Sequence, residues 1–187
     1  AIAVLLGTLL RSSFMIGMGS WFNFQYFLHT HSHIAILGWV FNICYYLLIK
    51  QFGLLGKSKY DKLFFLLNLS VLGMLFTFPF EGYALWSIIF STLHIIFSII
   101  FGVFFFIDTK SQKSISLKFA LAAIFFMIFS SLGPFSLGPI VTMGLKNSIW
   151  YNLAIYFYLH FQYNGWFLFT ILSLTLFQIN KFDKDNW

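Results

Sequence analysis

The chain has 187 residues, of which 60% are hydrophobic and 9% are charged. This composition excludes an ordinary soluble enzyme. It also argues against nucleic acid as a partner, although 11 Lys and Arg against 5 Asp and Glu give a net charge of +6. A membrane span takes ~20 apolar residues, so about six spans fit with short connections. We therefore expect an all-α, polytopic transmembrane bundle in the lipid bilayer, with residues 1–187 as one domain.

Apolar runs separated by Gly, Pro or Lys mark the expected helices. These runs cover residues 1–19, 22–49, 62–80, 84–107, 117–133 and 148–179. A loop is expected at 134–147. Because the first run starts at Ala1 without a Met, we expect that an N-terminal portion is missing and that the first helix is incomplete.

Lysines follow every second expected helix. They are Lys50, Lys57, Lys59 and Lys62 after the second, Lys110, Lys113 and Lys118 after the fourth, and Lys181 and Lys184 after the sixth. The positive-inside rule places such segments in the cytoplasm, so both termini are expected there. The expected location is the bacterial cytoplasmic membrane.

Every histidine of the chain lies in an apolar segment. The five are His29, His31, His33, His94 and His160. Ionisable side chains at membrane depth are costly, and neutral imidazole binds iron, copper or zinc, so we expect a haem or a metal ion at these histidines. With a single cysteine, Cys44, the chain has no internal disulfide and no cysteine-held cluster. The expected topology places all five histidines ~10–18 Å below the outer surface.

The second expected helix carries histidines on two faces. His29 and His33 are four residues apart and share a face, whereas His31 is rotated by about 200° from either. One helix is thus predicted to serve two sites. For each histidine the alternative is a hydrogen bond to a nearby polar group, and for His94, alone on its helix, that alternative is as good as ligation.

The segment from His31 to Val40 reads His-Ser-His-Ile-Ala-Ile-Leu-Gly-Trp-Val. It resembles the His-x-His-x4-Gly-Trp helix in the catalytic subunit of haem-copper oxidases and nitric oxide reductases, within the C-type branch that carries b haems. The resemblance implies that His31 binds a high-spin haem and His33 a low-spin haem. The chain has no His-Pro-Glu motif and no adjacent His-His pair, so the resemblance implies haem ligation rather than a complete haem-copper centre.

Part of this motif returns in the last expected helix. His160 precedes a Gly-Trp pair by the same spacing as His33 does. Tyr156, His160 and Asn164 follow at four-residue intervals, so we expect a polar stripe that faces the bundle interior. His160 is the expected second axial ligand. Asn164 is expected to orient an imidazole or to bind a polar ligand, with an interhelical hydrogen bond as the alternative.

Arg11 lies in the first apolar run and needs an anionic partner, which haem propionates would supply. If the first helix is incomplete, Arg11 lies near a membrane interface instead.

These observations predict a membrane redox protein, similar to oxidase subunit I, that binds haem b and carries electrons or binds a small gas. No catalytic residue is assigned, and oxidoreductase activity stays open. Expected partners are a redox partner or other membrane subunits. Two alternatives remain: a haem-free protein whose histidines hold copper, zinc or iron, and a metal or haem transport or assembly subunit.

Overall fold

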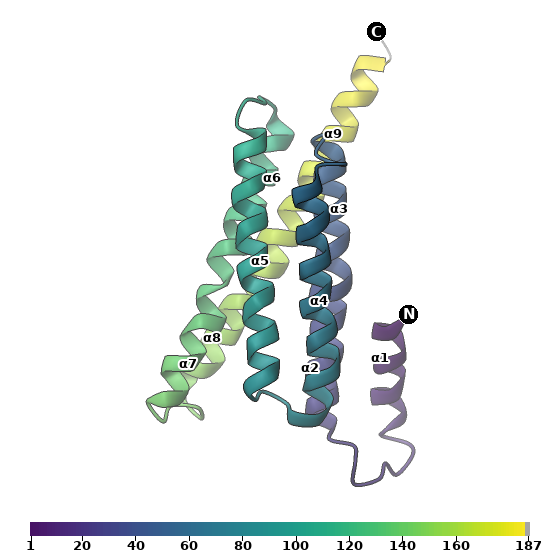
Figure 1. Ribbon diagram of the computed structural model, residues 1–187, viewed down its shortest axis with the longest axis vertical. Helices are drawn as coiled ribbons and strands as arrows, with labels where there is room; N and C mark the ends of the chain where they lie inside the picture. Colours follow the sequence, from purple (N-terminus) through teal and green to yellow (C-terminus); the bar gives the residue numbers. More distant parts are fainter. Residues whose placement is uncertain (186–187) are drawn as a thin grey trace. The chain divides into compact units, whose positions relative to one another are not determined.

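The computed structural model describes residues 1–185, with side chains described through Asn180, and contains only helices and loops in that range. The helices are α1 (Ile2–Ser12), α2 (Phe24–His33), η1 (Ile34–Val40), α3 (Phe41–Gln51), α4 (Ser58–Glu81), α5 (Leu85–Thr109), α6 (Ile115–Ser130), α7 (Leu132–Thr142), α8 (Ile149–His160), η2 (Phe161–Phe167) and α9 (Leu168–Asp185). Figure 1 shows their order along the chain. Both η segments are π-helices, and the prediction of an all-α protein is confirmed.

Among the described residues, four continuous helices are long and apolar enough to cross a membrane. They are Phe24–Gln51, Ser58–Glu81, Leu85–Thr109 and Ile115–Thr142. Each lies on an expected span, and the largest difference is at the C-terminal end of the last one. The run at 1–19 forms only the short helix α1. The Ser13 hydroxyl donates to the Leu10 carbonyl at 2.7 Å just beyond the end of that helix, a local bond that competes with helix continuation.

The loop expected at 134–147 is wrong over residues 134–142. Helix α7 extends through Thr142 and contains Pro139. Pro134 lies in the first turn of α7, where a missing N–H costs no helical hydrogen bond. Two Gly-Pro pairs therefore indicated a loop where the backbone continues as a helix.

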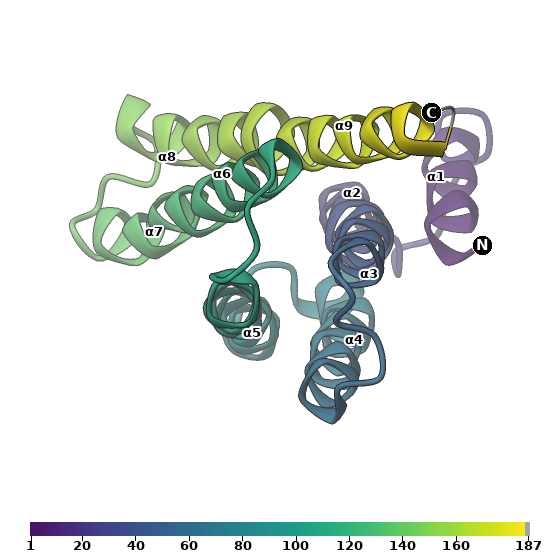
Figure 2. The same ribbon diagram turned by 90° about the horizontal axis from the view of Figure 1, so that it is seen from above.

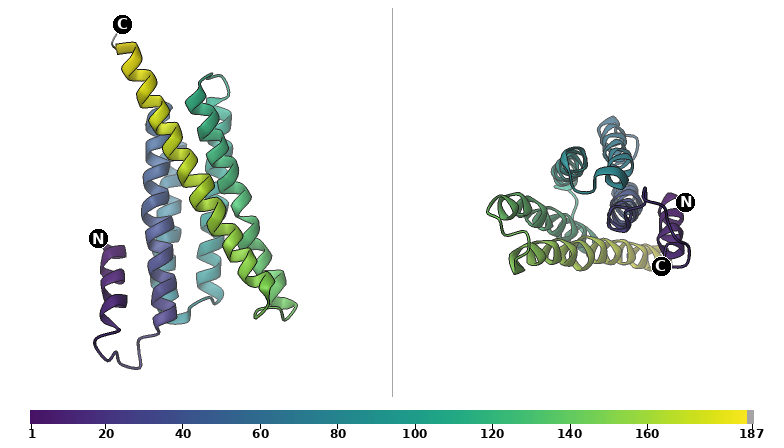
Figure 3. Two further views of the ribbon diagram at one scale, coloured as in Figure 1. Left: turned by 180° about the vertical axis from the view of Figure 1, so that it is seen from behind. Right: turned by 90° about the horizontal axis from the view of Figure 1, so that it is seen from below.

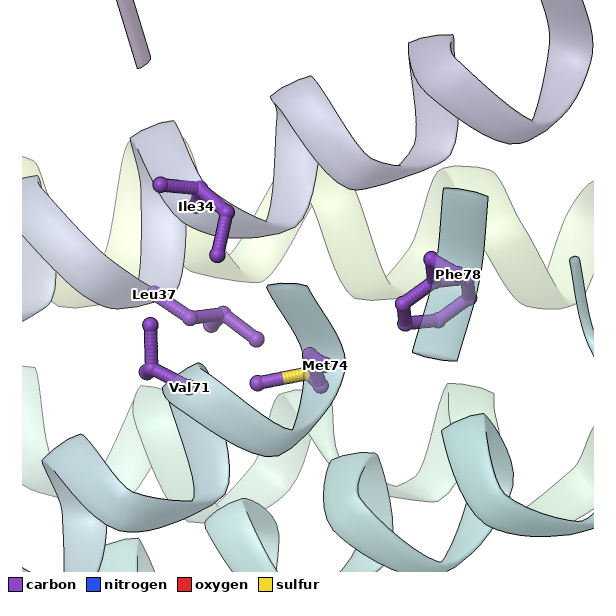
Figure 4. Packing of buried hydrophobic residues seen from close by; sticks show 5 residues of the cluster. All are labelled: Ile34, Leu37, Val71, Met74 and Phe78. Atoms are coloured by element: carbon purple, nitrogen blue, oxygen red, sulfur yellow. The ribbon is translucent and has the colours of Figure 1, made fainter. Parts of the chain in front are cut away.

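The chain divides into two compact units, and the first comprises residues 1–43 with 56–97. Here α2 packs against α1 and α4. Figure 4 shows Ile34 and Leu37 of η1 pointing toward Val71, Met74 and Phe78 of α4, which together form a buried apolar cluster. Between membrane helices such contacts stabilise mainly through close packing, because lipid is as apolar as the side chains.

The second unit comprises residues 44–55 with 98–187. Helix α6 packs along η2 and α9, and α7 packs along α8 (Figure 2). Figure 3 shows α8 and α9 as parts of one long rod. Gln51 Nε2 donates to the hydroxyls of Ser116 at 2.8 Å and Ser173 at 3.2 Å, and this polar network fixes the register of its helices. One bundle over residues 1–187 stays a prediction.

Candidate cofactor-binding site

In each copy of the His-x4-Gly-Trp motif, the residues after the histidine form a π-helix. Helix η1 begins directly after His33 and η2 directly after His160, and each has seven residues. The glycine and tryptophan are the fifth and sixth residues of both π-helices. Such segments are rare and are frequently found at functional sites. The similarity that the sequence indicated is therefore also a repeated backbone conformation.

Side chains bind the backbone of η1. Asn42 Nδ2 donates to the Gly38 carbonyl oxygen at 2.7 Å and to Asn68 Oδ1 at 2.8 Å. The imidazole of His94 hydrogen-bonds the backbone of Leu37. A π-helix departs from the regular i to i−4 pattern, and these side chains bind backbone groups within it.

His31 faces α1. Its Nδ1 lies 2.9 Å from the carbonyl oxygen of Ala3. A Cβ atom on Gly7 would lie 3.0 Å from the Cε1 of His31, so the imidazole fits against α1 because this residue is glycine. Gly7 therefore sets how closely α1 approaches the histidine.

His29 and His33 face Tyr83, away from α1. The Nδ1 of His33 lies 2.9 Å from the carbonyl oxygen of His29. Its ring centroid lies 4.5 Å from that of Phe78 and 5.9 Å from that of Tyr83, while the His29 ring lies 4.7 Å from Tyr83. The prediction that His31 faces away from His29 and His33 is confirmed.

The hydrogen bonds of His31 and His33 decide where each neutral ring carries its proton. A carbonyl oxygen only accepts, so Nδ1 of each ring is the donor. Nε2 of each neutral ring then holds a lone pair. Ligating histidines use this arrangement, with one nitrogen oriented by a carbonyl and the other on the metal.

His94 belongs to the same unit as these three histidines. Its side chain is 1% exposed, and its ring packs edge-on against Phe41 with centroids 4.9 Å apart. It is close enough to His33 for an electrostatic interaction. Because His31 and His33 also hydrogen-bond the backbone, this bond does not decide between the two alternatives for His94, and its ligation stays a prediction.

The stripe of Tyr156, His160 and Asn164 is exposed, so the prediction that it faces the interior is wrong. The other side of η2 packs against α6 instead, which leaves this stripe on the outward side. The buried residues of η2 are Gln162, Gly165, Trp166 and Phe167. Asn164 Nδ2 donates to His160 Nδ1 at 3.4 Å.

Gln162, one of these buried residues, makes an interhelical hydrogen bond. Its Nε2 donates to the Ser130 hydroxyl at 2.9 Å.

Arg11 is exposed in the last turn of α1, where a positive charge is favourable near the carboxyl end of a helix. Its contact with an anion stays a prediction.

Tyr83 lies beside His29 and His33, a contact that the sequence does not predict. The preceding residue, Gly82, has φ of 61°, a conformation that favours glycine. Glu81 Oε1 accepts from the backbone N–H of Ser87 at 2.7 Å and so holds the loop against α5. The Glu-Gly-Tyr sequence indicates a turn at residues 81–83. It does not indicate which side chains Tyr83 contacts.

Among the residues whose side chains are described, no group of three or more His, Cys, Asp or Glu is positioned to hold a metal ion. No family model, curated protein or solved structure matches the chain. We therefore infer function from the geometry of the histidines.

Proposed function

We propose that this chain is an integral membrane protein that binds b-type haem through His31 and His33 and transfers electrons or binds a small gas. One observation carries the proposal. Backbone carbonyl oxygens hold the Nδ1 atoms of both rings at 2.9 Å, which leaves the Nε2 lone pairs for iron. Because the rings lie on opposite sides of one helix, each histidine serves a different haem.

The way the ligands are distributed favours haem over a bare ion. Structural copper or zinc sites usually take three or four ligands from the protein, whereas haem iron takes four nitrogens from its porphyrin and one or two from the protein. A single well-oriented imidazole on each face of α2 suits the second case. When bound, haem supplies one-electron iron chemistry and, with an open axial position, gas binding.

The chain's own residues orient and shield these imidazoles. The carbonyls of Ala3 and His29 fix the two ring orientations, and Phe78 and Tyr83 cover the His33 ring. We assign His29 and His94 as alternative ligands on the His33 side, and Arg11 as a partner for a haem propionate.

The proposal includes six membrane-embedded helical segments joined as one bundle. The lysine distribution supports cytoplasmic termini, and the proposal places the chain in the bacterial cytoplasmic membrane. A redox partner or another membrane subunit would deliver the electrons.

A dithionite-reduced minus air-oxidised visible spectrum of the purified chain tests this function. We expect a b-type α-band, and His31→Ala and His33→Ala should each remove a different component of it. Ser32→Ala is the matched control, because the Ser32 hydroxyl donates to the Leu28 carbonyl of its own helix at 2.9 Å. The proposal would be overturned if the wild-type spectrum lacked this band and the purified chain contained copper or zinc that a chelator removes.

A further inference from the structure

The two copies of the motif correspond residue by residue, and the correspondence extends to the neighbouring helices. The pairs are His29 with Tyr156, His31 with Tyr158, His33 with His160 and Leu37 with Asn164. His31 packs against Gly7 of the preceding helix α1, and Tyr158 packs against Gly133 of the preceding helix α7. The copies therefore share their spacing, their π-helix and a glycine contact two residues before the motif histidine.

The copies differ in where the neutral imidazole carries its proton. In the first copy, His33 Nδ1 donates to the His29 carbonyl, and the residue four positions later is Leu37. In the second copy, that later position is Asn164, whose Nδ2 donates to His160 Nδ1 at 3.4 Å. A neutral imidazole has one N–H, so His160 carries its proton on Nε2. His33 presents a lone pair at Nε2, whereas His160 presents a hydrogen-bond donor.

The Nε2–H donor of His160 lies on an exposed surface with aromatic side chains. His160 and Asn164 are exposed, and Tyr156, one turn earlier on α8, is 67% exposed and adds a phenolic hydroxyl. The Phe161 ring packs edge-on to the His160 ring at 5.1 Å. In an apolar helix, such donors match a ligand that reaches the protein through lipid and offers an acceptor oxygen on a flat, apolar ring.

We propose that the second copy is a quinone-binding site, in which His160 Nε2–H donates to a quinone carbonyl oxygen. Tyr156 is the second donor, and Asn164 is a positioning residue that keeps the proton on Nε2. The role of this site rests on the proposed function: the quinone is the lipid-soluble carrier that exchanges electrons with the haem protein. The binding itself is measurable without haem.

The first experiment reads the tautomer directly. In ¹⁵N-histidine-labelled full-length chain, we expect the His160 resonances, assigned by their loss in His160→Ala, to show the proton on Nε2. Asn164→Leu gives the second copy the residue of the first, and it should move the proton to Nδ1. A proton on Nδ1 in the wild type, or no change in Asn164→Leu, overturns the assignment.

The second experiment measures binding. Ubiquinone-1 is titrated into full-length chain in phosphatidylcholine nanodiscs, with quenching of intrinsic fluorescence as the readout. His160→Ala and Asn164→Leu should each weaken saturable binding about three- to tenfold, the usual effect of losing one neutral hydrogen bond. His160→Gln keeps an N–H donor and should retain more affinity than His160→Ala. Thr175→Val, on the exposed side of α9, should bind as the wild type does.

The outcomes separate the two proposals. Saturable quinone binding that depends on His160, in a sample without a haem spectrum, would overturn the haem function and leave the quinone site standing. A haem spectrum with no saturable quinone binding would overturn the site alone. Binding that His160→Ala and Asn164→Leu leave unchanged would also overturn the site, because the phosphatidylcholine carbonyls or a different surface would then account for it.

Discussion

Gly7 and His31 meet where α1 packs on α2. A Cβ atom on Gly7 would lie 3.0 Å from the Cε1 atom of the imidazole, and the Nδ1 of the same ring lies 2.9 Å from the Ala3 carbonyl oxygen. The hydrogen bond and the close approach are both on the side of α2 that faces α1. The position of α1 and the orientation of His31 therefore depend on each other.

Gly7→Ala should disturb both the position of α1 and the orientation of the His31 ring. The added methyl group must displace the imidazole or α1, and we expect a loss of about 1–3 kcal/mol in the free energy of unfolding, the usual cost of overpacking. Gly17→Ala is the matched control, since nothing lies within 4 Å of a Cβ at that position. Unfolding of the purified variants in mixed micelles, followed by circular dichroism, measures the difference. Equal stability of the two variants would contradict the close contact.

The motif glycines should be sensitive to substitution in both copies. A Cβ on Gly38 would lie 2.9 Å from Val71 Cγ1, and a Cβ on Gly165 would overlap the Phe126 side chain. We expect Gly38→Ala and Gly165→Ala each to lower the free energy of unfolding by about 1–3 kcal/mol. Gly138→Ala, in α7, has open space and should stay near the wild type. The same micelle unfolding assay applies, and an effect in only one copy would show that the packing is not shared.

Asn42 and Asn68 should be energetically coupled. Asn42 Nδ2 bonds both Asn68 Oδ1 and the Gly38 carbonyl. Asn42→Leu leaves both acceptors without this donor, for an expected cost of about 1–3 kcal/mol. The double variant with Asn68→Leu should be more stable than the sum of the single effects predicts, by about 0.5–3 kcal/mol. A double-mutant cycle measures this coupling, and simple additivity would argue against the bond.

Gly82 should tolerate alanine less well than Gly53. Both have positive φ, 61° and 69°, so alanine is strained at either position. At Gly82, however, the new Cβ would also overlap the Tyr26 ring, while Gly53 has open space. We expect the free energy of unfolding of Gly82→Ala to be lower than that of Gly53→Ala by at least about 1 kcal/mol. Because the turn positions Tyr83, diethyl pyrocarbonate should also modify His29 faster in Gly82→Ala, as mass spectrometry of the digested protein would show.

Composition and apolar periodicity were enough to predict the helical class and the positions of the long helices, because both depend on which residues are apolar. The two faces of α2 followed from the same periodicity. His29, His31 and His33 lie before η1 begins, so the regular angular step holds among them.

The orientation of the last helix could not be predicted in this way. Tyr156, His160 and Asn164 do share one face, but it is the opposite face, with Gln162 and Gly165, that packs against α6, and a polar stripe does not by itself indicate which face packs. Nothing in a single sequence indicates a π-helix until two copies of a motif are compared in three dimensions. The contact between Tyr83 and the histidines was missed for a similar reason, since it depends on the backbone conformation of one glycine.

The approach of α7 to α8 at Gly133 also has a consequence for biosynthesis. A Cβ there would lie 2.9 Å from the Cβ of Tyr158, so the two helices touch at the backbone and are joined by a short loop that carries Lys146. Neighbouring apolar helices in such contact can leave the translocon together, and the apolar surface of two helices offsets the cost of moving one lysine across, about 2.5–3.5 kcal/mol at the bilayer centre. We therefore expect the last third of the chain to enter the membrane as a helical hairpin, in one step.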